Sequence, residues 1–341
     1  MTEPSVIAVT LGDVAGIGPE VVVRACCDER LPKSCRPIVV GHPEVVRRAV
    51  ALVGCALKVV EIDSLSVDTQ ITENELACWN PVGDDATHVE PGKIHVAAGQ
   101  AAYEYLIAAT HAALNGEVDA VTTAPLNKAA LQLAGHNYPG HTEILAETCG
   151  VSKFAMMLYL PAGEIVRSPF GLGVAHVTLH TSIASVPQLL DTPAIEEKIA
   201  LIDSFLRHVG CEAPRIGVCA LNPHAGEDGL FGDEERRLIA PAVASQRAAG
   251  IDVTGPLPAD TLFCRAVAGD FDGVAAMYHD QGHIALKLIG FDRAVNITLG
   301  LPIVRTSPSH GTAFDIAWQG HASANGMLEA LRVAALLAKR R

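Results

Sequence analysis

Three histidines follow short apolar segments, at points where β-strands are expected to end. They are His180, His224 and His279. The carboxyl ends of parallel strands meet along one edge of a sheet, where open α/β folds bind ligands. Neutral imidazole is a good ligand for zinc and other transition metals, so three imidazoles at this edge predict a site for one divalent cation. His176 and His283 are rival ligands, and spacing alone does not choose between them.

A metal ion held by three imidazoles and a water would also suit a hydrolase. Such an enzyme needs a carboxylate base near the metal, and Asp260, Asp280 and Glu227 are available. The alternative for each histidine taken alone is structural, a ring that is hydrogen-bonded at the surface or in the core. At this point the hydrolase interpretation stays open.

Cationic and polar side chains near the same strand ends indicate a pocket for an anion. The candidates are His141, Thr142, Lys287, Asn296 and Arg305. The chain has 25 basic and 38 acidic residues, a formal net charge of −13. In so acidic a chain, Lys and Arg near a metal site favour a phosphate or carboxylate ligand. The alternatives are that Thr142 caps a helix and that Lys287 and Arg305 are ordinary solvated charges.

The elements that must position these residues are short strands alternating with helices. Strands are predicted at 6–11, 36–40, 57–62, 119–123, 154–160, 172–179, 215–221, 273–278 and 295–299. Helices are predicted at 21–27, 96–114, 195–209 and 327–339. Pro19 precedes the first helix and Asn115-Gly116 ends the second, as helix termini favour. The alternation predicts an α/β protein with mainly parallel sheets.

A glycine-rich loop at 12–20 joins the first predicted strand to the first helix. Gly16 and Gly18 are present, but Val21 stands where G-x-G-x-x-G needs its third glycine. The Rossmann dinucleotide fingerprint is therefore not matched. Two interpretations remain, a tight strand-to-helix turn and a ligand-binding loop.

Composition narrows the class of protein. The 341 residues are 49% apolar and 4% aromatic, enough for a large aliphatic core. The basic run at 339–341 stands alone, which argues against nucleic acid and anionic membranes as partners. Nine cysteines without a C-x-x-C pair favour a reducing compartment over a disulfide framework. Without a signal-like or membrane-spanning segment, we expect a soluble, cytoplasmic protein.

Seven segments, taken together in their order and spacing, resemble the PdxA family, the 4-hydroxythreonine-4-phosphate dehydrogenases of vitamin B6 (pyridoxine) biosynthesis. Each segment is weak alone, but together they extend over nearly the whole chain. The segments are 12–20, 123–128, 140–143, 221–227, 255–261, 278–282 and 296–306.

The resemblance implies two α/β/α domains around a cleft, similar to isocitrate and isopropylmalate dehydrogenases, in an obligate homodimer. Residues 1–127 and 306–341 would form an outer domain, and residues 128–305 a central domain with the dimer interface and most site residues. By match to the family's motifs, the metal ligands are His180, His224 and His279, with His279 supplied across the dimer interface. The substrate contacts fall on His141, Thr142, Lys287, Asn296 and Arg305. NAD or NADP is the implied cofactor, at residues the motifs do not identify, with one Zn, Mg, Co or Mn ion per site.

The activity implied is oxidation at C3 of a 4-phosphorylated 3-hydroxy acid, followed by decarboxylation. Lys287, Asp260 and Asp280 are candidate proton-transfer groups. Val14 stands where the family's loop has proline, and His283 stands where the biosynthetic enzymes have an apolar Leu-Pro. At the second position the sequence is similar to that of a family branch that oxidises 4-phospho-D-threonate or 4-phospho-D-erythronate. It is also similar there to a dihydrodiol-carboxylate dehydrogenase of terephthalate breakdown. Alternatives from other classes are a metal-dependent hydrolase, an acyltransferase-like protein that binds coenzyme A and a non-catalytic binding protein.

Overall fold

The computed structural model describes residues 3–66, 71–72, 74–83 and 85–339, so the last two residues of the basic run at 339–341 lie outside the described part. The chain divides into two compact units. Unit 1 comprises Met1–Ser152 and Leu301–Arg341, and unit 2 comprises Lys153–Gly300. These boundaries differ from the expected ones at 127/128 and 305/306. As a result, unit 1 contains His141, Thr142 and Arg305, which the domain prediction places in the central domain.

Unit 1 is built on a parallel sheet in the order β3-β4-β2-β1-β5-β12. Its central strand β1 is buried along its whole length, as expected for a continuous β-branched and apolar run in a sheet covered on both faces. The strands of the unit are β1 (Ser5–Thr10), β2 (Cys35–Val40), β3 (Lys58–Ile62), β4 (Glu75–Trp79), β5 (Ala120–Thr123) and β12 (Arg305–Pro308).

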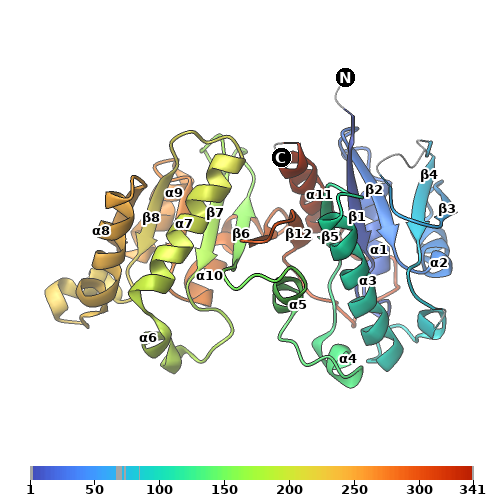
Figure 1. Ribbon diagram of the computed structural model, residues 1–341, viewed down its shortest axis with the longest axis horizontal. Helices are drawn as coiled ribbons and strands as arrows, with labels where there is room; N and C mark the ends of the chain where they lie inside the picture. The colour runs from blue at the N-terminus through green and yellow to red at the C-terminus, as the bar shows by residue number, and fades with distance from the viewer. Residues whose placement is uncertain (1–2, 67–70, 73, 84, 340–341) are drawn as a thin grey trace. The chain divides into compact units, whose positions relative to one another are not determined.

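Helices cover both faces of the unit 1 sheet (Figure 1). The Ala-rich helix α3 packs on β1 and β5, and α4 and α5 pack on α3. Helix α11 packs on β1, β5 and β12, and α1 contacts both α11 and α2. The helices of the unit are α1 (Gly18–Cys26), α2 (Pro43–Val53), α3 (Val96–Leu114), α4 (Lys128–Leu133), α5 (His141–Thr148) and α11 (Asn325–Ala338), with a 3-10 turn η1 (Asp85–His88).

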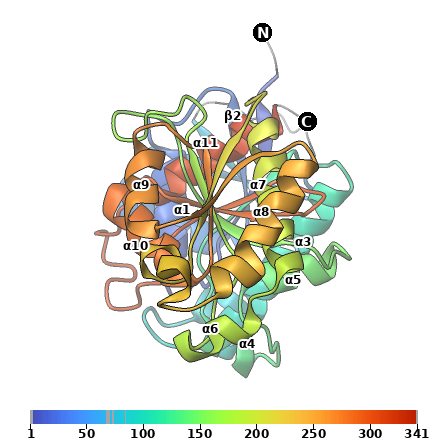
Figure 2. The ribbon, with the colours of Figure 1, turned by 90° about the vertical axis from the view of Figure 1, so that its left-hand side faces the viewer.

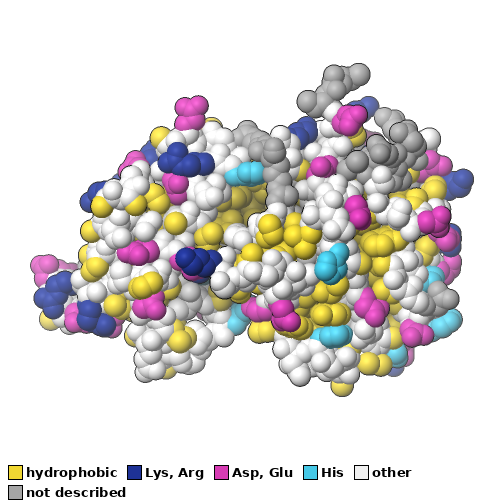
Figure 3. Space-filling view, in the orientation of Figure 1, with side chains coloured by type: hydrophobic (Ala, Val, Ile, Leu, Met, Phe, Trp, Pro, Cys, Tyr) yellow, Lys and Arg dark blue, Asp and Glu magenta, His cyan; other side chains and the backbone are white. Residues whose placement is uncertain are grey.

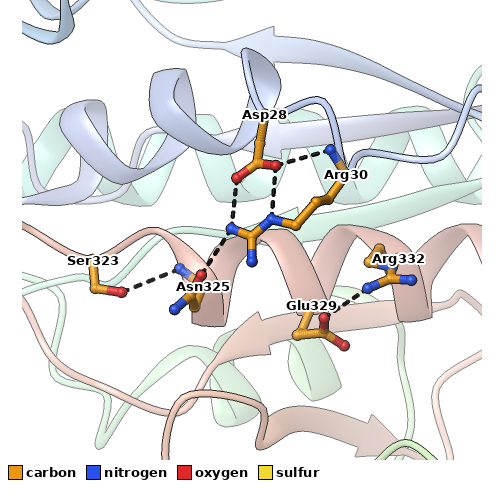
Figure 4. A network of polar contacts seen from close by, with 6 residues as sticks. All are labelled: Asp28, Arg30, Ser323, Asn325, Glu329 and Arg332. Carbon is orange, nitrogen blue, oxygen red and sulfur yellow. Dashed lines mark hydrogen bonds and ion pairs between the residues drawn. The ribbon is translucent and has the colours of Figure 1, made fainter.

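Polar contacts join the C-terminal helix to the N-terminal half of unit 1 (Figure 4). The Arg30 guanidinium pairs with the Asp28 carboxylate just after α1 and donates to Asn325 Oδ1 at 2.9 Å. These contacts lie at the surface, so they contribute less than the buried apolar face of α11. They do show how residues nearly 300 positions apart close one unit.

Unit 2 is built on a mixed sheet in the order β11-β6-β7-β10-β8-β9. Strand β6 runs antiparallel to both β7 and β11, and the remaining pairs are parallel. Helices α7 and α8 cover one face, and α9 and α10 cover the other (Figure 2). The strands are β6 (Ala155–Leu160), β7 (Leu172–His176), β8 (Arg215–Cys219), β9 (Asp252–Leu257), β10 (Gly273–Ala276) and β11 (Val295–Leu299). The helices are α6 (Val186–Leu189), α7 (Thr192–His208), α8 (Ala240–Ala248), α9 (Ala259–Val267) and α10 (His279–Gly290), with the 3-10 segments η2 (Ile183–Ser185) and η3 (Pro223–Gly229) and the π-helical turn η4 (Glu235–Ile239).

The α/β class is confirmed, and the ends of three predicted strands need correction. Strand β7 ends at His176 instead of residue 179, β8 at Cys219 instead of 221, and β10 at Ala276 instead of 278. The chain leaves the regular ladder earlier because the residues that follow form the loops and the helix start that carry the candidate site. His180 therefore lies in a loop, and His279 begins a helix.

The glycine-rich loop at 12–20 is a tightly packed turn. Every residue from 11 to 20 is buried. Gly12 has φ +63°, and a Cβ there would lie 2.3 Å from the carbonyl oxygen of Pro125. A Cβ on Gly18 would lie 2.2 Å from the carbonyl oxygen of Leu11. Close approach of backbone to backbone accounts for both glycines, as in the turn interpretation.

The surface of the described residues carries mixed charge. On the face shown in Figure 3, Lys and Arg side chains lie among Asp and Glu side chains. All nine cysteines are free thiols. Among the described residues, no helix combines the length and apolar character needed to cross a membrane.

Candidate functional site

A pocket of about 410 Å³ in unit 2 brings two of the predicted histidines together. His180 reaches it from the loop after β7, and His279 from the first residue of α10. Their ring centroids are 5.8 Å apart. The other lining residues are Leu179, Thr181, Ser182, Ile183, Val186, Tyr278 and Asp280. Two imidazoles, three hydroxyl-bearing side chains and one carboxylate therefore line one pocket together with apolar residues.

The orientation of His279 is held from two sides. Its Nδ1 lies 2.6 Å from Asp280 Oδ1, and because a carboxylate can only accept, Nδ1 donates this hydrogen bond. Its ring also stacks on His283, with centroids 3.7 Å apart and planes inclined by 11°. This arrangement keeps Nε2 as the nitrogen with a free lone pair. Carboxylate–histidine pairs of this kind orient metal ligands.

His176 and His283, the rival ligands, form a buried pair next to His279 and do not line the pocket. His176 is the last residue of β7, and its Nε2 lies 3.2 Å from His283 Nδ1. Burial lowers the pKa of His176 to about 3 and that of His283 to about 4, with neighbouring histidines adding to the shift, so both rings are neutral at pH 7. His180, not His176, lines the pocket.

The loop that carries His224 follows β8 and has an unusual backbone. Five consecutive residues, from His224 to Asp228, have positive φ angles between 45° and 81°. Only Gly226 among them is a glycine, so the segment stores strain, as functional loops often do. His224 is exposed and does not line the pocket. Within the described residues of one chain, no three His, Cys, Asp or Glu side chains converge to hold a metal ion.

The candidate proton-transfer groups occupy different places in unit 2. Asp280 borders the pocket, whereas Asp260 lies exposed in the first turn of α9. Lys287 lies further along α10, with its Nζ 5.9 Å from the centre of the Phe291 ring. Asn296 lies on β11, and its buried Oδ1 finds no hydrogen-bond partner in the part of the chain that the structure describes. An unpaired buried acceptor fits a ligand-binding role.

Unit 1 gathers the other three predicted substrate contacts. Arg305 opens β12, is 2% exposed and donates from Nη2 to Thr123 Oγ1 at 2.6 Å. Burial lowers its pKa to about 9, and nearby Glu143 partly opposes this, so the guanidinium stays charged at pH 7. His141 and Thr142 form the start of α5, where backbone N–H groups favour an anion. Burial and then Arg305 lower the pKa of His141 well below its usual value, so its ring is neutral.

Sequence reasoning did not single out Thr181 and Ser182, which follow His180 in the pocket wall. The available signal was their position in the sequence, because both polar residues directly follow the candidate ligand His180. It also did not single out Gln281 and Glu235, whose side chains contact the backbone around the predicted ligands. No local pattern marks those two residues, because their roles depend on the tertiary fold.

A family model described as the pyridoxal phosphate biosynthetic protein PdxA matches residues 33–334. The chain belongs to the PdxA family. The D-threonate 4-phosphate dehydrogenase of Salmonella typhimurium is 44% identical to it over 98% of this chain and 100% of its own. Among solved PdxA structures, a 4-hydroxythreonine-4-phosphate dehydrogenase from Klebsiella pneumoniae is 45% identical, covers 98% and 99% of the two chains and superposes with a TM-score of 0.87. A terephthalate 1,2-cis-dihydrodiol dehydrogenase from Burkholderia xenovorans is 31% identical, covers 98% of each chain and has a TM-score of 0.65.

These three proteins are dehydrogenases by name, and two of the three names specify a phosphorylated compound. The prediction of the family from sequence is therefore confirmed. The individual metal and substrate residues stay predictions.

Proposed function

We propose that this protein oxidises the C3 hydroxyl of a 4-phosphorylated 3-hydroxy acid, with NAD or NADP as hydride acceptor and one divalent metal ion. The substrate is 4-hydroxythreonine-4-phosphate or its 2-hydroxy analogue 4-phospho-D-threonate or 4-phospho-D-erythronate. The observation that carries the proposal is the unit 2 pocket in which His180 and His279 face each other beside Thr181 and Ser182. Membership of a family whose relatives are named dehydrogenases supports the reaction type.

The donor set fits a borderline metal such as zinc. His180 and His279 of the same chain supply two imidazoles to one pocket, whereas the family's motifs imply that His279 is supplied across the dimer interface. The Asp280 carboxylate orients His279. His224 is the third candidate, on an exposed loop outside that pocket. One chain does not assemble three ligands among its described residues, which agrees with a site completed by a second copy of the chain.

The apolar face of α10 supports that second copy. Ile284, Leu288 and Phe291 are spaced along one side of the helix and are 58%, 83% and 55% exposed. This helix also carries His279 and Lys287. Exposed apolar residues in a contiguous row are typical of an interface between subunits. We therefore include a homodimer, with the active site shared across the interface, in the proposal.

When bound, the metal ion would lower the pKa of the C3 hydroxyl and the nicotinamide would accept the hydride from C3. The chain's own residues bind and orient the substrate. Arg305, with the start of α5 at His141 and Thr142, holds the phosphate, because a charged guanidinium and helix N–H groups both favour an anion. Asn296 and Lys287 are the candidates for the carboxylate end of the substrate.

Proton removal from C3–OH falls to Lys287, Asp260 or Asp280. Asp280 is already engaged with His279 Nδ1, which favours an orienting role for it over that of a base. The 3-oxo product is a β-keto acid and would lose its carboxylate as carbon dioxide. The electron pair of the broken C–C bond then remains at C2 as an enolate, which takes up a proton.

An alternative within the family is oxidation of a dihydrodiol carboxylate, which has no phosphate. The buried, charged Arg305 favours the phosphorylated substrate. The hydrolase alternative would use the same histidines but would produce no reduced nicotinamide.

The test is to assay the full-length protein with NAD and with NADP against the three phosphorylated acids in parallel, following reduced nicotinamide. Turnover of at least one substrate, abolished by a chelator and restored by zinc, is the expected result. Hydrolysis without cofactor reduction would replace the proposal with the hydrolase. His224→Ala is expected to abolish metal-dependent turnover while the dimer still folds.

A further inference from the structure

The carboxylate of Glu235 lies buried beneath the loop that carries His224. Glu235 is 5% exposed and begins η4, a single turn of π-helix. Its Oε1 accepts hydrogen bonds from the backbone N–H groups of Leu221 at 2.9 Å and Asn222 at 2.7 Å. Its Oε2 accepts one from Asn222 Nδ2 at 3.0 Å. One carboxylate therefore satisfies three donors at the point where the chain leaves β8 and enters the loop.

The backbone conformation of this loop requires stabilisation by contacts from outside the loop. Residues with a Cβ adopt positive φ only where their surroundings enforce it, and here four do so within five positions. Gly226 lies at the centre of the loop, and a Cβ on it would be 2.8 Å from Glu235 Oε2. The carboxylate thus holds the beginning of the loop by hydrogen bonds and leaves no room for a side chain at its centre.

A second side chain joins the same strand end to the helix that carries His279. Gln281 Nε2 donates to the carbonyl oxygen of Ala220 at 2.7 Å, and its Oε1 accepts from the backbone N–H of Met277 at 2.7 Å. Ala220 directly precedes Leu221, which Glu235 holds. A continuous series of part-buried hydrogen bonds therefore links the loop that carries His224 to the helix that carries His279.

We infer that Glu235 is a positioning residue for His224. It fixes the left-handed loop, and so the direction in which the imidazole is presented. This inference rests on the proposed function, because it takes His224 as a metal ligand. Outer partners that orient metal ligands typically change metal affinity by about 10–100-fold when they are removed.

The chain offers two matched controls. Glu234 precedes Glu235, and its Oε2 accepts from the same Asn222 side chain at 2.8 Å, so Glu234→Gln removes a neighbouring charge and spares the backbone contacts. Asp272 is 1% exposed and holds Ser168 and Arg215 at the opposite end of β10. Asp272→Asn therefore reports the effect of losing a buried carboxylate elsewhere in the unit.

The experiment measures the zinc affinity of the full-length protein by competition with a chromophoric chelator, and amide hydrogen exchange of residues 220–230. Glu235→Gln is expected to weaken zinc binding about 10–100-fold and to speed exchange in that segment. Glu234→Gln and Asp272→Asn are expected to leave zinc affinity within about threefold of the wild type, because neither carboxylate bonds the backbone of the loop that carries His224. Gly226→Ala is also expected to weaken zinc binding, because its Cβ would press on Glu235 Oε2. This variant provides a second test of the positioning role if Glu235→Gln does not fold.

The outcomes separate the two hypotheses. Loss of zinc binding in His224→Ala, with wild-type affinity and exchange in Glu235→Gln and Gly226→Ala, would overturn the positioning role and leave the metal centre intact. Unchanged affinity in His224→Ala would overturn the metal centre, and the positioning of a ligand with it. An equal loss in Asp272→Asn would also overturn the positioning role, because general destabilisation would then explain the effect.

Discussion

The imidazole rings of His279 and His283 lie stacked almost in parallel, 3.7 Å apart between centroids. The second ring is itself held by His176, whose Nε2 is 3.2 Å from its Nδ1. The Asp280 carboxylate fixes the other side of His279. A residue that begins a helix at the pocket wall is thus held by a ring and a carboxylate, and its Nε2 is left for a ligand.

The stack predicts different results for two substitutions of His283. His283→Leu removes the flat ring, whereas His283→Phe keeps it and loses only the Nδ1 contacts with His176 Nε2 and the His279 carbonyl oxygen. An aromatic pair is worth about 0.5–1.5 kcal/mol, so we expect His283→Leu to lower kcat/KM by about tenfold and His283→Phe to lower it by much less. Steady-state kinetics on the phosphorylated substrate measure both. Equal losses would show that the Nδ1 contacts, and not the stack, hold His279.

Arg305 predicts a specific loss of phosphate recognition. Arg305→Lys keeps a charge, but an ammonium cannot bond Thr123 and a phosphate in the fork geometry of a guanidinium. We expect KM for the phosphorylated acid to rise by about tenfold or more, in line with the loss of a charge-assisted hydrogen bond. The control is the same acid without its phosphate, whose KM should change little. A similar rise in KM for both compounds would place Arg305 at another part of the substrate.

If the exposed apolar side of α10 forms the dimer interface, a single charged substitution on it should disrupt the dimer. Leu288 is 83% exposed, and in a homodimer an aspartate at this position would be buried without a partner. We expect Leu288→Asp to shift the protein from dimer to monomer in light scattering and to remove activity. Leu133→Asp is the matched control, since Leu133 is 65% exposed on α4 of unit 1 and should leave the dimer intact. A Leu288→Asp protein that stays dimeric would rule out this face as the interface.

Much of the fold could be predicted from the sequence because the buried strands are apolar and β-branched. The strand Ser5–Thr10 and the Ala-rich helix Val96–Leu114 can be recognised from their own residue types, without knowledge of their neighbours in the fold. Strand β12 was not predicted, because Arg305–Pro308 contains a charge, two hydroxyls and a proline and is buried only through its partners. The antiparallel direction of β6 likewise depends on its neighbours β7 and β11 and not on its own sequence.

The sequence could predict which residue types the candidate site contains, but not which of these residues lie together. The strand-end argument identified His180 and His279, and the structure places both in one pocket. The same argument could not separate His180 from His176, four residues earlier, because that choice depends on where β7 ends. Nor could it find Glu235, whose contacts with residues 13 and 14 positions earlier follow from the path of the loop between them.

The buried carboxyl of Asp13 should make the free energy of unfolding depend on pH, and Asp13→Asn should remove this dependence. It is fully buried in the turn after β1, and its Oδ2 has no hydrogen-bond partner among the residues the structure describes. Burial raises its pKa to about 6, although the Ala15 N–H and the nearby His95 oppose the shift. A carboxyl whose pKa is raised on folding favours the folded state when protonated. Its contribution is full below the unfolded pKa of about 3.8 and is lost as the pH rises through about 6.

We therefore expect Asp13→Asn, compared with the wild type, to gain about 2 kcal/mol in free energy of unfolding between about pH 4 and about pH 7.5. Urea unfolding at a series of pH values measures this difference. Asp28→Asn is the control, because the hydrogen bonds from Arg30 lower the pKa of Asp28. Its contribution is lost only below the pH range in which Asp13 titrates, so the difference between Asp28→Asn and the wild type should stay constant from about pH 4 to about pH 7.5. A difference between Asp13→Asn and the wild type that stays constant with pH would contradict a raised pKa for Asp13 in the folded protein.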